Sequence, residues 1–82
     1  MNKETISEIN PDALLADGFD DALLGVCYQF GQLPVVSYDY NKCIDILIQR
    51  DGMSEEEALE YFEFNVLGSY MGPNTPVFIQ TF

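Results

Sequence analysis

The chain has 82 residues, 48% of them hydrophobic, and its 14 acidic and three basic residues give a formal net charge of −11. This length excludes a second domain, the hydrophobic share excludes a disordered chain, and no apolar run approaches the roughly 20 residues that span a bilayer. The start MNKETISEIN also lacks the apolar core of an export signal. We therefore expect a cytoplasmic protein whose charge repels nucleic acids and membranes and attracts basic protein surfaces.

The first part of the chain is predicted to contain a flexible segment and two helices. Residues 1–9 are polar and are expected to be flexible. Asn10 and the proline after it predict the start of a short helix over residues 11–16. Residues 19–30 are predicted to form a longer helix, because their apolar side chains recur at helical spacing. These side chains are Phe19, Ala22, Leu23, Val26, Cys27 and Phe30.

The second part of the chain is predicted to contain a helical hairpin. Asp39 can cap a helix over residues 40–50, whose apolar residues again follow helical spacing. Ser54 and Glu57 have the spacing of a capping box, in which each side chain bonds the backbone N–H of the other residue. The second helix of the hairpin is therefore expected over residues 54–68.

Two short segments have the composition of strands. Residues 33–38 and 77–81 are rich in β-branched and aromatic side chains and are bounded by turn residues. We expect the two segments to pair with each other. The predicted fold is a single α+β domain over residues 10–82, with three to four helices, including the hairpin, and a small two-stranded sheet.

The last predicted helix is apolar on two sides. Glu56, Glu60 and Glu63 form an acidic stripe, and Tyr61 and Phe64 form an apolar stripe away from the core face. A helix of this kind is either enclosed within the domain or offers one side to a partner. We predict that these five residues bind a partner. The core face is expected to be formed by Ala58, Leu59, Phe62, Val66 and Ser69.

No catalytic or metal-binding motif is present in the sequence. The chain has no His, which removes the usual general base and the commonest metal ligand. Cys27 and Cys43 do not form a zinc motif and are expected to be small buried side chains. Asp17, Asp20 and Asp21 do not match an EF-hand, and helix capping explains them without a metal. We expect neither enzymatic activity nor a bound cofactor.

Asn65 is a polar residue at the edge of the predicted core face. Its amide is expected to bond a backbone group of a neighbouring loop, at residues 33–39 or 72–76. A ligand contact is the alternative.

Four motifs of the chain have a recognisable pattern: YDYNKCI at 38–44, RDGMSEEEA at 50–58, FEFNVLG at 62–68, and Gly72 with TPVF at 75–78. They resemble motifs of a widespread set of small hypothetical proteins from tailed phages and bacterial genomes. The similarity covers residues 16–79, and no activity is assigned to the set. It implies a phage or prophage setting, in which small acidic proteins are often inhibitors of host machinery.

The sequence therefore favours a protein-binding function. The main hypothesis is an accessory protein or inhibitor that docks on a basic, nucleic-acid-binding surface of a host protein, in the extreme case as a DNA mimic. A homo-oligomeric structural protein is the first alternative, with an interface at Tyr61 and Phe64 or at the edge of residues 77–81. A small-ligand binder is the second, although the three basic residues make a phosphate-bearing ligand a poor fit.

Overall fold

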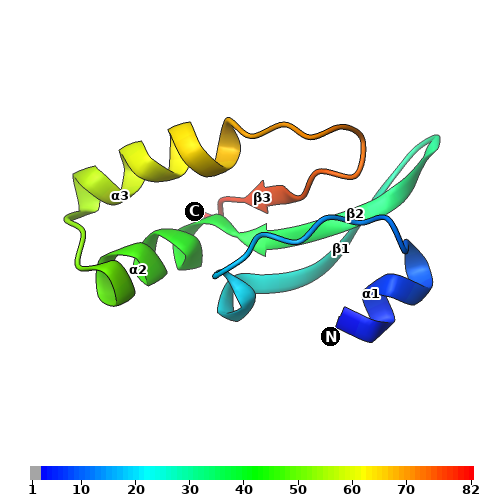
Figure 1. Ribbon diagram of the computed structural model, residues 1–82, viewed down its shortest axis with the longest axis horizontal. Coiled ribbons are helices and arrows are strands. Elements are labelled where there is room, and N and C mark those ends of the chain that lie inside the picture. Colours follow the sequence, from blue (N-terminus) through cyan, green and yellow to red (C-terminus); the bar gives the residue numbers. More distant parts are fainter. Residues whose placement is uncertain (1–2) are drawn as a thin grey trace.

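Helices and strands are interleaved along the chain in the computed structural model, which describes residues 3–82. The α2–α3 hairpin extends from one end of the sheet, and α1 lies near the other end (Figure 1). The expected α+β class is confirmed, but the sheet has three strands where two were expected. In chain order the elements are α1 (Lys3–Ile9), the 3₁₀ helix η1 (Asp20–Ala22), β1 (Leu23–Gln29), β2 (Gln32–Asp39), α2 (Tyr40–Asp51), α3 (Glu55–Phe62), the π-helix η2 (Glu63–Leu67) and β3 (Val77–Ile79).

The strand β2 is the centre of the sheet. It pairs antiparallel with β1 and parallel with β3. A turn at residues 30–31 joins β1 to β2, and Gly31 has there a φ of 76°, which favours glycine. The α2–α3 hairpin connects β2 to β3, since parallel strands need a long crossover. The central position explains why Pro34 to Tyr38 are all buried.

The prediction of a helix over residues 19–30 is wrong. Only η1 is helical there, and the rest of the segment forms β1. Nearly every residue from Ala22 to Phe30 is apolar, so a helical spacing can be found by chance. Pairing with β2, together with the β-branched and aromatic side chains, favours the strand.

The N-terminal segments also differ from the prediction. No helix forms over residues 11–16, because the Asn10 side chain accepts a bond from the Asp12 N–H and donates to the Pro34 carbonyl at 2.8 Å. The following loop runs across the sheet, where the Ala16 N–H donates to the Tyr38 hydroxyl at 2.8 Å. Of the segment over residues 1–9 that is expected to be flexible, residues 1–2 lie outside the described residues, and Lys3–Ile9 form the helix α1, whose Ile6 is buried in the core.

The predicted helical hairpin is confirmed. Asp39 accepts a bond from the Lys42 N–H at the start of α2, and Gly52 ends α2 in the left-handed conformation, with a φ of 68°. Ser54 and Glu57 form the expected capping box at the start of α3. The prediction missed the end of α3, where the backbone changes to a π-helix at Glu63.

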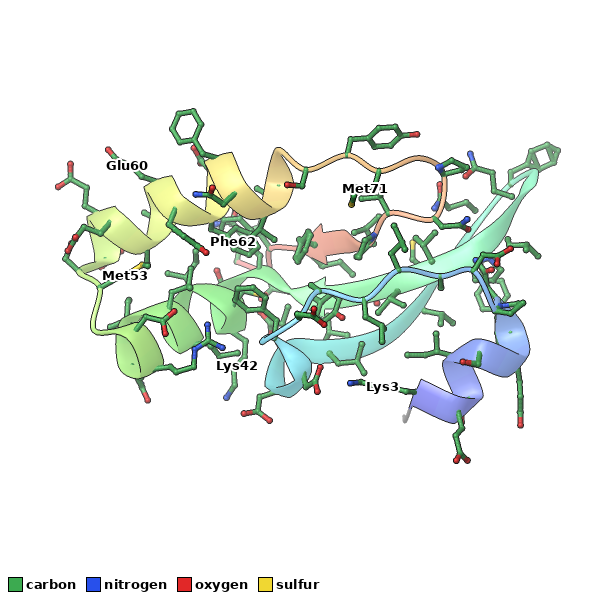
Figure 2. The ribbon with its side chains drawn as sticks, viewed as in Figure 1. Lys3, Lys42, Met53, Glu60, Phe62 and Met71 are labelled. Carbon is green, nitrogen blue, oxygen red and sulfur yellow. The ribbon has the colours of Figure 1, made fainter. Side chains whose placement is uncertain are left out.

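Aromatic rings hold the hairpin against the sheet. Phe62 is fully buried between α3 and the layer formed by α2 and β3 (Figure 2). Its ring meets Phe19, Tyr40 and Phe78 edge to face, with centroid distances of 5.9, 5.2 and 5.0 Å. The Phe78 ring also stacks on Tyr38 at 5.5 Å. One cluster therefore joins η1, both helices of the hairpin and the two paired strands β2 and β3.

Candidate functional site

The outer side of α3 carries the side chains that the sequence singled out. Ala58 and Phe62 are fully buried and fix the orientation of the helix. The predicted binding residues are all exposed as a consequence, and Figure 2 shows Glu60 on the side of α3 opposite the sheet. The Phe64 side chain is 80% exposed and the Tyr61 side chain is 43% exposed. Neither ring is needed to fill the core.

Three of the five predicted residues share one shallow depression. Glu60, Tyr61 and Phe64 line a hollow of about 350 Å³. Met53 and Glu57, which were not predicted as site residues, also line this hollow. Glu56 and Glu63 are exposed on the same helix and do not line it. The hollow thus combines two aromatic rings with carboxylates at its side.

The surroundings of this hollow are acidic. The glutamates of the segment are all exposed: Glu55, Glu56, Glu57, Glu60 and Glu63. No Lys or Arg occurs in residues 51–82. Hydrogen bonds from Ser54 lower the pKa of Glu57, so that this carboxylate stays ionised further into the acid range.

The base nearest in sequence, Arg50, is already bound. Its guanidinium donates two bonds to the Asp51 carboxylate, both at 3.0 Å, and one to the Gly18 carbonyl at 2.6 Å. It also lies over the Phe19 ring, 5.7 Å from the centroid. The bonds from Arg50 lower the pKa of Asp51. Arg50 therefore neutralises Asp51 and leaves the glutamates of α3 uncompensated.

Asn65 lies in the π-helix and not at a loop contact. The Gly68 N–H donates to the Glu63 carbonyl at 3.0 Å, five residues back, as the π-helix requires. The Asn65 amide donates to the Tyr61 carbonyl at 3.2 Å in its own helix, so the predicted bond to a neighbouring loop is wrong. The Asn65 side chain is exposed and lines the hollow next to Tyr61. The π-helices of proteins often occur at functional sites.

A second cavity was not predicted from the sequence. This groove of about 290 Å³ has mostly apolar walls, which include Leu14, Met71 and Phe78, with Arg50 and Asn65 among the polar residues. Figure 2 shows Met71 on the loop above β3. The walls come from separate segments that hydrogen bonds hold together, and no local pattern in the sequence links these segments.

The acidic residues near η1 do not form a metal site. Asp20 makes an ion pair with Lys3 at 3.2 Å, and both side chains are largely exposed. Among residues 3–82, no group of three or more Asp, Glu, Cys or His side chains is arranged to hold a metal ion.

The two cysteines differ in their environment, and we expect them to differ in reactivity. Cys43 is fully buried in α2, as expected, and burial raises the pKa of its thiol to about 12. At pH 8 only about one thiol in ten thousand is then ionised, and the thiolate is the reactive form. Cys27 lies on β1 and is half-buried. When the folded protein is treated with iodoacetamide, mass spectrometry should show that Cys27 is alkylated before Cys43. Equal alkylation rates of the two thiols in the folded protein would contradict this. In denaturant, both thiols should react.

No family model, no curated protein and no solved structure matches this chain. The resemblance to small phage proteins therefore stays a prediction. Within residues 3–82 the structure contains no helix with the length and apolar character needed to cross a membrane.

Proposed function

We propose that this chain is a non-enzymatic accessory protein that binds another protein through the exposed side of α3. The observation that supports this most is the exposure of Tyr61 and Phe64 beside the carboxylates of the same helix. Aromatic anchors in a hollow with a charged rim are typical of the energetic centre of a protein interface. The resemblance to phage proteins extends the proposal to an inhibitor of host machinery.

The charge of the chain favours a basic partner surface. The net charge is −11, and five glutamates lie between residues 55 and 63 with no base among them. Carboxylates in such density accelerate the encounter with Lys- and Arg-rich surfaces and oppose the approach of nucleic acid. A surface that normally binds nucleic acid has the complementary charge. The sharpest form of the proposal is therefore occupation of such a surface in place of DNA or RNA.

The Tyr61→Ala/Phe64→Ala variant is expected to lose its protein partners. We would immobilise the chain, capture proteins from a bacterial lysate at low and high salt, and identify them by mass spectrometry. Removal of two aromatic anchors should weaken binding by about 100-fold, which corresponds to about 1–2 kcal/mol for each anchor. Partners of the native chain should be enriched in basic surfaces, and high salt should reduce their capture.

A matched control removes the same atoms elsewhere. The Tyr70→Ala/Phe82→Ala variant also loses one tyrosine and one phenylalanine, which are 76% and 114% exposed, without a change in charge. It should retain the partners that the α3 variant loses. Equal loss from both variants, or unchanged capture by the α3 variant, would remove α3 as the binding surface.

The groove at Leu14, Met71 and Phe78 favours a second candidate function, the binding of a small molecule. Its walls are mostly apolar, and Arg50, the guanidinium among its lining residues, is already bound to Asp51 and Gly18. An uncharged, largely apolar molecule fits this lining better than a phosphate ester. In the capture experiment this function would give no salt-dependent protein partner.

A further inference from the structure

The exposed apolar side chains of this protein lie mainly where the sequence has no charge. Residues 22–38 and 64–82 contain no Asp, Glu, Lys or Arg, although the chain has 17 such residues in total. Ten of the 13 large hydrophobic side chains exposed among residues 3–82 belong to these two segments. The first segment forms β1, its turn and nearly all of β2. The β1–β2 hairpin, which carries Leu24, Tyr28, Phe30 and Leu33, therefore presents a neutral and partly apolar surface on a strongly acidic molecule.

The strand β1 is an open edge of the sheet. Among residues 3–82 it pairs with β2 on one side only. Proteins usually protect such an edge with a charge, a proline, a β-bulge, a covering helix or loop, or a very short strand. β1 has seven residues and no charge or proline, whereas the opposite edge strand β3 has three residues. The pairing of β1 with β2 is irregular between Leu23 and Gly25 and between Cys27 and Gln29, and it is regular over Gly25–Cys27.

We propose that β1 pairs antiparallel with the β1 strand of a second copy of this chain, which joins two three-stranded sheets into one. This inference goes beyond the proposed binding by α3 and does not depend on it. Leu24 and Tyr28, which are 53% and 75% exposed, would be covered at the contact. A two-fold axis through the strand uses the same segment of both copies and closes the assembly as a dimer.

Charge favours a second copy of this chain as the partner that pairs with the edge of β1. Two molecules of net charge −11 repel each other wherever their acidic surfaces meet, and β1 is an edge at which no like charges face each other. Asp20 and Asp21 directly precede β1. Antiparallel pairing places these acids of the two copies at opposite ends of the paired strands. A strand of seven residues is about 23 Å long at roughly 3.3 Å per residue. The acids are therefore separated by more than the electrostatic screening length of about 8 Å. A basic partner would gain nothing from a neutral edge.

The other neutral segment is a poorer interface. Its exposed residues Phe64 and Leu67 lie on η2, directly after the glutamates of α3, so a second copy would bring those carboxylates together. The structure therefore favours β1 for contact between two copies.

The test compares two tyrosines of equal exposure. Tyr28 on β1 is 75% exposed and Tyr70 is 76% exposed, and an aspartate at either position changes the net charge by the same amount. Sedimentation equilibrium should show a dimer for the native chain and for Tyr70→Asp. Tyr28→Asp should raise the dimer dissociation constant by about tenfold or more, because a charge at the strand pairing meets the apolar edge of the other copy twice.

Hydrogen exchange identifies the contact directly. Protection of the backbone amides of Leu23–Gln29 should increase with protein concentration, and protection of the amides of β3 should not. A monomer at millimolar concentration would overturn the proposal. A dimer lost in Tyr70→Asp and kept in Tyr28→Asp would overturn it too, as would a dimer without concentration-dependent protection of β1. Circular dichroism of both variants checks that each one folds.

Discussion

The Phe62→Ala variant is expected to lose about 3–5 kcal/mol of its free energy of unfolding, because it leaves a cavity in a well-packed cluster. The Phe62 ring is fully buried and meets Phe19, Tyr40 and Phe78 edge to face. Small domains are stable by only about 5–15 kcal/mol in total, so this single change should bring the protein close to unfolding. Urea denaturation followed by circular dichroism measures the loss.

Phe64 provides the control on the same helical segment. It lies two residues further along the chain and is 80% exposed, so Phe64→Ala removes the same atoms without opening a cavity. Its free energy of unfolding should change by no more than about 0.5 kcal/mol. Similar losses in the two variants would mean that Phe64 packs against the protein and is not free to bind a partner.

The Asn10→Asp variant is expected to lose at least about 3 kcal/mol at neutral pH, since it leaves buried acceptors without a donor and buries a charge. The Asn10 side chain is 1% exposed, and its amide donates to the Pro34 carbonyl at 2.8 Å and to the Asn74 side-chain oxygen at 3.1 Å. An aspartate of the same size keeps the bond from the Asp12 N–H and turns an oxygen towards both acceptors.

This loss should depend on pH with a defined sign. Burial and the facing acceptors raise the pKa of the new carboxyl group in the folded state above its value in the unfolded chain. The protonated group can donate a bond, so the variant is closest to the native protein below the pKa of the unfolded state. Its deficit then grows as the pH rises through the folded-state pKa. Unfolding titrations of both proteins from acid to neutral pH measure the difference.

An exposed asparagine makes the matching control. Asn41 also donates to a backbone carbonyl, that of Thr81, at 3.1 Å, but its side chain is exposed. Asn41→Asp should cost less than about 1 kcal/mol and show little added pH dependence, because water solvates the new charge. A pH-independent loss in Asn10→Asp would show that the amide donor is not the reason for the loss.

Local signals in the sequence were sufficient for the helical hairpin. Capping and helix ends depend on neighbouring residues, so Asp39, Gly52 and the Ser54/Glu57 pair could be interpreted without knowledge of the fold. Helical geometry also placed Tyr61 and Phe64 away from the side of Ala58, Phe62 and Val66. It left open whether the two rings are enclosed within the domain or exposed, and the structure shows that they are exposed.

The N-terminal half could not be predicted in this way, because distant contacts decide its structure. β1 exists through its pairing with β2, and Asn10 bonds to residues 24 and 64 positions away in the chain. A run that is apolar at nearly every position carries no period that separates a helix from a strand. The groove was missed for the same reason, since its walls come together only in the folded chain.

Hydrogen bonds to Asn74 connect the two loops that flank the groove at Leu14, Met71 and Phe78. Asn10 and Leu14 both bond to Asn74, so the loop before η1 and the loop before β3 hold each other in place. Release of either loop would free the other and loosen the docking of β3 on β2. The two flanks of the groove are therefore expected to loosen together and not one at a time.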